Sequence, residues 1–389
     1  MNRQTASRWN SFGTSIFSVM SARAREMQAV NLSQGFPDFD APEAVKEAAC
    51  EAIRRGENQY APAIGIAPLR QAISKRYAEQ YGMTYDAERE VTVCTGATEA
   101  LFCVMQALCN AGDELLTFEP FYDSYAACAV SAGARLVAVP LKAPQWKFDP
   151  AALAAAVTPR TKVLLINSPH NPTGRVFTVD ELASIATIAQ QHDLFVVTDE
   201  VYEELYFDSS AHVSLASLPG MRERTVVISS TSKSFSITGW KVGYTLAPAA
   251  ITDAIRRVHQ FTVFCSATPL QWGALAAFDL GEAYFSELRQ SYQAKRDRLM
   301  AILEPAGFVC AKPEGTYFIV ADYSKIDQRG DLEFANWFVQ DAGIACIPLS
   351  VFYERPELMT EKCVRFAFCK KEETLDAAAA RLARWVDHR

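Results

Sequence analysis

The stretch VLLINSPHNPTG, residues 163–174, joins a continuous apolar run to a rigid polar loop that contains two prolines and a glycine. The same pattern recurs in LFVVTDEVY (194–202) and in TVVISSTSKSF (225–235). Runs that are apolar on both faces are typical of strands covered by helices on each side. A helical stretch at 179–192 separates the first two runs. This alternation predicts an α/β fold with a doubly wound, mostly parallel sheet.

Residues upstream continue the alternation. The helix predicted for residues 68–81 has a proline in its first turn and ends at Gly82. A second Ala-rich helix is expected at 97–109. The other strands of the sheet are predicted at 91–94, 114–118 and 136–139.

The predicted secondary-structure pattern changes near residue 283, where the alternation of strands and helices is followed by a long helix and short strands. We predict an N-terminal arm with part of a small domain at 1–45, a large domain at 46–283 and a small α+β domain at 284–389. Within the small domain we expect helices at 284–303, at 332–341 and from Glu373, a hairpin-like segment at 315–323, and strands at 344–347 and 364–368.

Composition and charge exclude several classes of protein. The 389 residues are half hydrophobic, and 38 basic against 45 acidic residues give a net charge of −7, which disfavours nucleic acid or an anionic membrane as the main partner. No apolar run approaches the roughly 18 residues of a membrane span, and the first 25 residues lack a secretory h-region. Ten scattered cysteines without a CxxC pair predict reduced thiols that act as small buried apolar residues, no metal site and a cytoplasmic protein.

The polar residues that follow the strands indicate a binding site, because ligands of open α/β sheets collect beyond the carboxyl ends of the strands. Strand 91–94 runs into TGATEAL (95–101), a glycine turn that opens a helix and leaves free N–H groups for an anion. The same sequence is also compatible with an ordinary turn in which a threonine caps the helix. The other strands deliver Tyr122, Asn171, Asp199, Tyr202, Ser230 and Lys233 to this edge.

Taken together, these side chains suit pyridoxal phosphate. That cofactor needs a lysine for a Schiff base, an acid that keeps its ring nitrogen protonated, and an anchored phosphate. Neighbouring positive charge would lower the pKa of the lysine and leave it free to move a proton. Each residue alone has a simpler explanation: Asp199 as a helix cap, Lys233 on a solvated loop, Asn171 as a turn residue. Their delivery by consecutive units to one edge favours the cofactor site.

The same segments resemble class I aminotransferases of the pyridoxal-phosphate fold type I. The resemblance runs in order over nearly the whole chain and is nearest to the branch of methionine aminotransferases and kynurenine–glutamine transaminases. It implies ping-pong transfer of an amino group from an L-amino acid to a 2-oxo acid. The segments that carry it are SQGFPDF (33–39), NQYAP (58–62), TGATEAL (95–101), NPTG (171–174), DEVY (199–202), SKSF (232–235), TGWKVG (238–243) and IPLSVF (347–352).

The resemblance implies a role for each matching residue around the cofactor ring. Lys233 would form the Schiff base and shuttle the proton, and Asp199 would pair with the pyridine nitrogen. Asn171 and Tyr202 would bond the 3-oxygen of the ring, on which Tyr122 would stack.

The phosphate would be held by the turn that contains Gly96, Ala97 and Thr98, together with Ser230 and Lys241. Many relatives have arginine where Lys241 stands, and lysine binds phosphate as a point charge.

Tyr60 would reach the phosphate of a partner subunit, so the resemblance also implies a homodimer with shared active sites.

The resemblance assigns the substrate α-carboxylate to Arg365. It implies that Gly35 lines the substrate pocket through its backbone and that Asn171 also contacts the substrate. A surface arginine on a strand is the simpler alternative for Arg365. Cys265 stands where some kynurenine-using relatives have histidine, which argues against kynurenine as the preferred substrate.

We expect apolar and aromatic side chains around the substrate, which favour methionine, then aromatic amino acids and glutamine, over a dicarboxylate. These residues are Phe17, Phe36, Tyr60, Tyr122 and Phe264.

Three other functions compete with the aminotransferase. A carbon–sulfur β-lyase of the same fold would use the same lysine and release pyruvate and ammonia without an acceptor. A non-catalytic pyridoxal-phosphate-binding module fused to a DNA-binding domain would need an additional basic domain, and only about thirty residues precede SQGFPDF. A nicotinamide dehydrogenase would need GxGxxG after a strand, which the sequence lacks.

Overall fold

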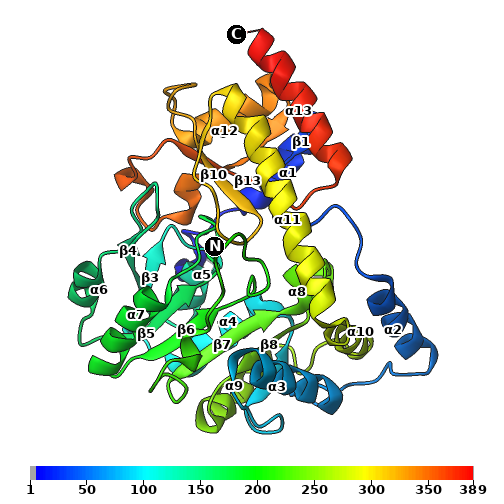
Figure 1. The fold of residues 1–389 in the computed structure, drawn as a ribbon. Coiled ribbons are helices and arrows are strands. Elements are labelled where there is room, and N and C mark those ends of the chain that lie inside the picture. The colour runs from blue at the N-terminus through cyan, green and yellow to red at the C-terminus, as the bar shows by residue number, and fades with distance from the viewer. Residues whose placement is uncertain (1–5, 389) are drawn as a thin grey trace, which may run out of the picture.

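The computed structural model describes residues 6–388, so the first five residues of the predicted N-terminal arm and residue 389 lie outside the description. A seven-stranded sheet forms the centre of the larger part, in the order β2-β8-β7-β6-β5-β3-β4 (Figure 1). Its strands are β2 (Val91–Cys94), β3 (Glu114–Glu119), β4 (Arg135–Pro140), β5 (Thr161–Asn167), β6 (Phe195–Asp199), β7 (Thr225–Ser230) and β8 (Gly243–Leu246).

The pairing confirms a mostly parallel sheet. Strands β4, β3, β5, β6 and β7 pair in parallel, whereas β8 is antiparallel to both β7 and β2. Strand β8 was not predicted from the sequence, because this four-residue strand begins at a glycine and offers little periodicity. The other six strands agree with their predicted positions to within two residues.

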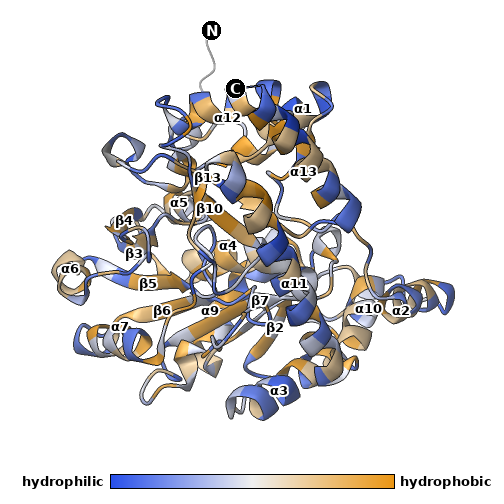
Figure 2. Ribbon diagram, turned by 45° about the horizontal axis from the view of Figure 1, so that its top comes forward, coloured by the Kyte–Doolittle hydropathy of each residue, from blue (hydrophilic) through white to orange (hydrophobic). Residues whose placement is uncertain are grey.

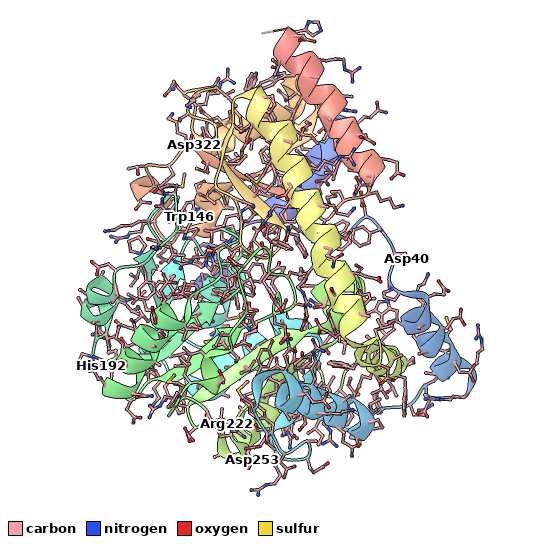
Figure 3. The ribbon with its side chains drawn as sticks, viewed as in Figure 1. Asp40, Trp146, His192, Arg222, Asp253 and Asp322 are labelled. Carbon is pink, nitrogen blue, oxygen red and sulfur yellow. The ribbon has the colours of Figure 1, made fainter. Side chains whose placement is uncertain are left out.

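Helices cover both faces of this sheet, and β5, β6 and β7 at its centre are largely orange, that is hydrophobic, in Figure 2. Apolar residues of α4, α5 and α9 pack on one face, and α7 packs on the other. Polar side chains such as His192 and Asp253 project outward, as Figure 3 shows. The helices of this part are α2 (Glu43–Arg54), α3 (Ala67–Tyr81), α4 (Gly96–Leu108), α5 (Ser124–Ser131), α6 (Pro150–Ala156), α7 (Val179–Gln191), α8 (Thr231–Ser234), α9 (Ala249–Thr262) and α10 (Thr268–Phe278).

A smaller four-stranded antiparallel sheet has the order β12-β13-β10-β9. The N-terminal strand β1 (Val30–Asn31) pairs in parallel with β11 (Ile344–Ala345), so segments from the first and last parts of the sequence lie side by side here (Figure 1). The other elements are α1 (Ile16–Glu26), α11 (Gly281–Leu303), β9 (Val309–Cys310), β10 (Phe318–Asp322), α12 (Asp331–Asp341), β12 (Ile347–Pro348), β13 (Cys363–Ala367) and α13 (Glu372–Asp387). Single 3-10 turns occur at Ser7–Trp9, Leu215–Ser217, Thr238–Trp240, Glu304–Ala306, Leu349–Phe352 and Pro356–Leu358.

The predicted boundary at residue 283 falls in the first turn of α11, and the three domain boundaries stay predictions. The prediction of a hairpin-like segment at 315–323 was wrong, because these residues hold a single strand, β10, that pairs with β9 and β13. Its first residues are bound to loops of the larger part instead, since Gly315 N–H donates to Gly174 O and Thr316 N–H to Leu205 O.

The single strand predicted at 344–347 was also wrong. Its residues form two short strands in different sheets, because β11 pairs with β1 whereas β12 pairs with β13.

All ten cysteines are free thiols, and seven are buried as predicted. Cys50 is exposed, and Cys265 and Cys310 are half-buried, so these three do not serve as fully buried apolar residues. Within residues 6–388, no helix combines the length and apolarity that a transmembrane span requires.

The close approach of Gly243 to the start of α4 gives a stability prediction. A Cβ at Gly243 would lie 2.6 Å from the carbonyl carbon of Gly96 and 2.7 Å from the nitrogen of Ala97. We expect Gly243→Ala to lower the free energy of unfolding by about 1–3 kcal/mol, because overpacking displaces backbone. Gly13→Ala is the matched control, since nothing lies within 4 Å of the added Cβ. Equal denaturation midpoints for the two variants would contradict the prediction.

Candidate active site

A cavity of about 300 Å³ lies at the carboxyl ends of β5, β6 and β7. Asn167, Asp199 and Ser230 end these three strands and line the cavity; Asp199 and Ser230 were predicted from the sequence, whereas Asn167 was not. The smaller sheet closes it from the opposite side with Phe318 of β10 and Arg365 of β13. The lining residues are Phe17, Gln34, Gly35, Phe36, Ala97, Thr98, Leu101, Tyr122, Asn167, Asn171, Asp199, Val201, Tyr202, Ser230, Ser232, Lys233, Thr238, Lys241, Phe318 and Arg365.

Asp199 is a buried carboxylate held by neighbours from two other elements. The Tyr125 hydroxyl in α5 donates to Asp199 Oδ2 at 2.7 Å, and the Asn167 amide donates to the Asp199 carbonyl at 2.8 Å. Burial raises the pKa of Asp199 to about 6, although the hydrogen bond from Tyr125 opposes the shift. Tyr125 was not predicted as a site residue, since a tyrosine three residues after Tyr122 has the pattern of an ordinary core residue.

Lys233 lies in α8, the short helix that follows β7, and its side chain lines the cavity. Its Nζ is 5.9 Å from the centroid of the Tyr202 ring. Burial lowers the pKa of Lys233 to about 8, and the positive charges of Lys241 and Arg365 act in the same direction. The predicted direction is confirmed, with burial as the largest cause. A pKa near 8 leaves a sizeable fraction of the amine neutral at physiological pH.

Arg365 is 1% exposed, which excludes the alternative of a surface arginine. Its Nη1 donates to Asn171 Oδ1 at 2.7 Å, and its guanidinium carbon lies 3.9 Å from the centroid of the Phe318 ring. Burial lowers the pKa of Arg365 to about 10, so the side chain stays charged at neutral pH. Its buried Nε has no hydrogen-bond partner among the described residues. Among residues 6–388, no carboxylate forms an ion pair with this charge, which lines the cavity.

Asn171 is fixed from both sides. Its backbone N–H donates to Asn167 Oδ1 at 2.7 Å, and its side-chain oxygen accepts from Arg365. The amide nitrogen of Asn171 is therefore the group left to donate into the cavity.

Residues 34–36 form a strap at the cavity wall that side chains from the smaller part hold in place. The Tyr317 hydroxyl donates to Gly35 O at 2.6 Å, and Lys370 Nζ donates to Gln34 O at 3.1 Å and to Phe36 O at 3.0 Å. The Gln34 amide donates to Phe17 O at 2.7 Å, which ties α1 to the strap. Tyr317, Lys370 and the side chain of Gln34 carry no local sequence signal for this contact, because their partners lie in distant segments.

The opposite end of the cavity has the features of an anion site. Ala97 and Thr98 line it from the first turn of α4, and Lys241 Nζ lies 3.5 Å from Thr98 Oγ1. Thr95 does not cap this helix; its hydroxyl pairs with Ser266 at 3.1 Å instead. Gly96 has a φ of +76° and lies beside Lys241 behind the lining. The threonine-cap alternative therefore does not hold here.

Besides Gly96, two predicted residues, Tyr60 and Phe264, do not line the cavity. Tyr60 is 82% exposed, and its ring packs edge-on against Phe264 at a centroid distance of 5.2 Å. Neither Tyr60 nor Phe264 is among the residues that line the cavity within a single chain.

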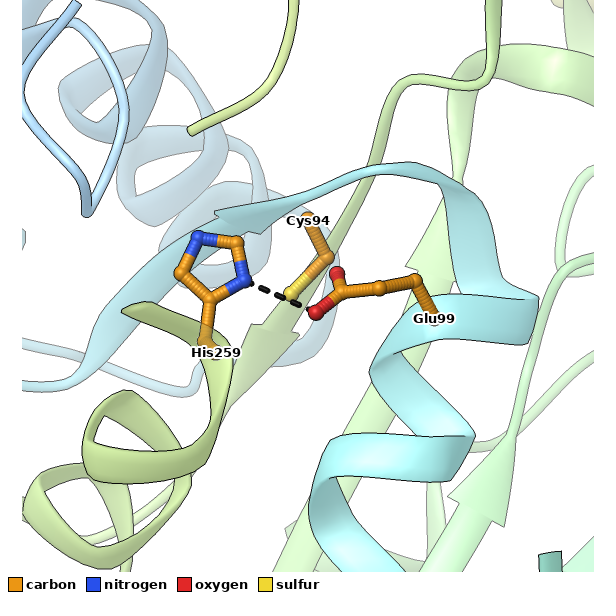
Figure 4. Close-up of side chains that lie close together, drawn as sticks. All are labelled: Cys94, Glu99 and His259. Carbon is orange, nitrogen blue, oxygen red and sulfur yellow. Dashed lines mark hydrogen bonds and ion pairs between the residues drawn. The ribbon is translucent and has the colours of Figure 1, made fainter. Parts of the chain in front are cut away.

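Cys94, Glu99 and His259 lie close together beside the first turn of α4 (Figure 4). Their side-chain atoms that could bind a metal ion lie within 4.8 Å of one another. Both ring nitrogens of His259 already have partners: Nδ1 lies 2.9 Å from Glu99 Oε1 and Nε2 lies 2.8 Å from Ala63 O. A hydrogen-bonded imidazolium–carboxylate pair explains this geometry without a cation. The prediction of no metal site stays a prediction.

The donor set fits pyridoxal phosphate. One end offers the backbone N–H groups of a helix start and an ammonium for a phosphate. The middle offers a buried carboxylate for a protonated ring nitrogen, and the lysine amine lies beside it. The Arg365 guanidinium, whose Nε has no hydrogen-bond partner among the described residues, adds a site for a second anion.

Comparisons with known proteins agree with this geometry. Residues 28–382 match the family described as aminotransferase class I and II. A probable N-succinyldiaminopimelate aminotransferase of Mycobacterium tuberculosis is 44% identical over 97% of this chain and 98% of its own length. The methionine aminotransferase of Escherichia coli is 41% identical over 95% of each chain, and human kynurenine–oxoglutarate transaminase 1 is 38% identical over 93% of each.

Solved structures show the same relationship. A methionine aminotransferase from Escherichia coli superposes with a TM-score of 0.94 at 40% identity, covering 98% of this chain and 100% of that one. The N-succinyldiaminopimelate aminotransferase structure from Mycobacterium tuberculosis gives a TM-score of 0.95 at 44% identity, with the same coverage. The chain therefore belongs to the class I and II aminotransferase family and is a pyridoxal-phosphate-dependent aminotransferase of fold type I.

Proposed function

We propose that methionine is the preferred amino donor of this aminotransferase, followed by aromatic amino acids and glutamine, with a 2-oxo acid as acceptor. The observation that carries the proposal is the charge distribution of the cavity. Among the described lining residues, Arg365 is the only arginine, and the other cations are Lys233 and Lys241. Phe17, Phe36 and Phe318 provide apolar surface near it, which suits an uncharged donor side chain.

Arg365 is assigned to the α-carboxylate of the substrate. Its buried guanidinium can bind a carboxylate through two N–H groups, and Asn171 and Phe318 hold its orientation. Gly35 would contribute backbone to the same pocket, because Tyr317 and Lys370 fix the strap that contains it. If Arg365 binds the α-carboxylate, the described lining offers no second arginine for a carboxylate at the end of the substrate side chain.

Lys233 is assigned to the proton transfer. Bound pyridoxal phosphate supplies an aldehyde that accepts amino groups and a ring that withdraws electrons from the substrate Cα. The Lys233 amine, with a pKa lowered to about 8, can take the proton from Cα. Asp199 would hold the proton on the ring nitrogen, and Tyr125 would hold Asp199 in place.

The remaining residues would hold the cofactor in place. Asn171 and Tyr202 are assigned to the 3-oxygen, and Tyr122 to the face of the ring. Ala97, Thr98 and Lys241 at the start of α4, with Ser230 at the end of β7, are assigned to the phosphate. Gly96 would allow the turn that presents these N–H groups, since its φ is +76°.

A homodimer with shared active sites is part of the proposal. Tyr60 and Phe261 are 82% and 86% exposed, and Phe264 beside Tyr60 is 48% exposed, so an aromatic surface is available for a second copy. Tyr60 would extend from it toward the partner's phosphate. The cytoplasmic location and the absence of nucleic-acid or membrane partners rest on the sequence alone and stay predictions.

Substitution of Arg365 tests the assignment of the carboxylate. We expect Arg365→Lys to reduce kcat/KM for methionine on the order of a hundredfold, because a point charge replaces a two-pronged donor in a buried site. The thermal midpoint and the bound cofactor absorbance should change little. A kcat/KM within threefold of wild type would contradict the assignment.

A donor panel tests the substrate class. Methionine, phenylalanine, glutamine, kynurenine, aspartate and N-succinyl-diaminopimelate should be compared with one 2-oxo acid acceptor. We expect kcat/KM for methionine to exceed that for aspartate at least tenfold, a difference of about 1.4 kcal/mol. A preference for N-succinyl-diaminopimelate or aspartate would overturn the proposed substrate and leave the aminotransferase activity itself intact.

A further inference from the structure

His259 and Glu99 form a buried pair directly behind the phosphate end of the cavity. Glu99 lies in the first turn of α4, and its side chain extends toward His259 of α9, as Figure 4 shows. His259 is 1% exposed and Glu99 is 9% exposed. Ala97, Thr98 and Leu101 of the same helix line the cavity, whereas Glu99 does not. The pair therefore supports the opposite face of the turn assigned to the phosphate.

Every hydrogen bond to the Glu99 carboxylate stabilises its negative charge. Oε2 accepts the Thr95 N–H at 3.0 Å, and Oε1 accepts from His259 Nδ1 at 2.9 Å and from the Cys103 thiol at 2.8 Å. A bare carboxylate in the turn that binds a phosphate dianion would repel it. His259 is the group that can cancel this charge.

We propose that His259 is a positioning residue for the cofactor phosphate: its imidazolium neutralises Glu99, so that the start of α4 binds the phosphate tightly, and cofactor affinity decreases when the imidazole loses its proton. The inference rests on the proposed assignment of the α4 turn to the phosphate. It adds to that assignment a residue that does not touch the cofactor.

When His259 gains or loses its proton, the interaction with Glu99 changes, whereas the other groups around the ring keep their charges and contacts. Arg256 of α9 donates to Thr92 and Val91 and keeps its charge. Burial raises the pKa of the Cys94 and Cys103 thiols, which stay neutral. The bond from Nε2 to Ala63 O persists in the neutral Nε2–H tautomer.

The direction of the pH effect follows from this arrangement. Burial lowers the pKa of His259, but Glu99 outweighs it, and the pKa ends above 6.5. The same contact holds the pKa of Glu99 below its usual value despite burial. As the pH rises through the pKa of His259, the imidazole becomes neutral while Glu99 stays negative. Cofactor affinity is therefore expected to decrease in that range.

The test measures the Kd of pyridoxamine phosphate for the full chain freed of cofactor, because this form makes no bond with Lys233. At pH 6.5 we expect His259→Gln to weaken binding about tenfold, since an unbalanced charge then lies beside the phosphate site. This ratio to wild type should shrink as the pH rises. The double variant His259→Gln/Glu99→Gln should recover affinity to within about threefold of wild type, because it removes the charge as well.

His192→Gln is the control, since this exposed histidine lies at the outer end of α7 (Figure 3). A double variant that binds no better than His259→Gln would show a merely structural role and overturn the inference. Unchanged binding by His259→Gln would overturn it as well, with the cofactor site intact. A wild-type chain that does not bind pyridoxamine phosphate would instead overturn the phosphate assignment on which the inference rests.

Discussion

The active site depends on burial of opposite charges at the edge where three parallel strands end. Asp199 is buried at the end of β6, and Arg365 faces the same cavity from β13. Neither charge is stable away from water unless neighbouring polar groups are fixed around it. The Tyr125 hydroxyl and the Val201 N–H supply those groups for the Asp199 carboxylate, and Asn171 supplies one for Arg365. Much of the loop structure around the cavity can be understood as the support for these two charges.

The same burial accounts for the reactivity expected of Lys233. Removal from water favours the neutral amine, and the nearby cations strengthen the effect. At the phosphate end the situation is reversed, because a helix start and Lys241 favour an anion. Glu99 is the exception there, and its pairing with His259 removes the conflict.

The sequence predicted the elements that local pattern controls. Continuous apolar runs separated by amphipathic helices indicated the parallel sheet, and the rule that strand ends share one edge brought Asn171, Asp199 and Lys233 together. It did not predict β8 or the partners of 344–347, because an apolar tetrapeptide does not encode which strand it pairs with. Tyr125 and Lys370 were missed because their roles come from contacts across at least 74 residues. The placement of Tyr60 against a partner subunit stays a prediction.

The central claim is that the amine of Lys233 is the one that binds the cofactor covalently. Borohydride reduction of the purified holoenzyme, followed by proteolysis and mass mapping, tests it directly. We expect the added mass of the reduced cofactor on the peptide that contains Lys233, and no labelling in Lys233→Ala. A label on Lys241 or on any other residue, or no label at all, would show that Lys233 does not form this bond.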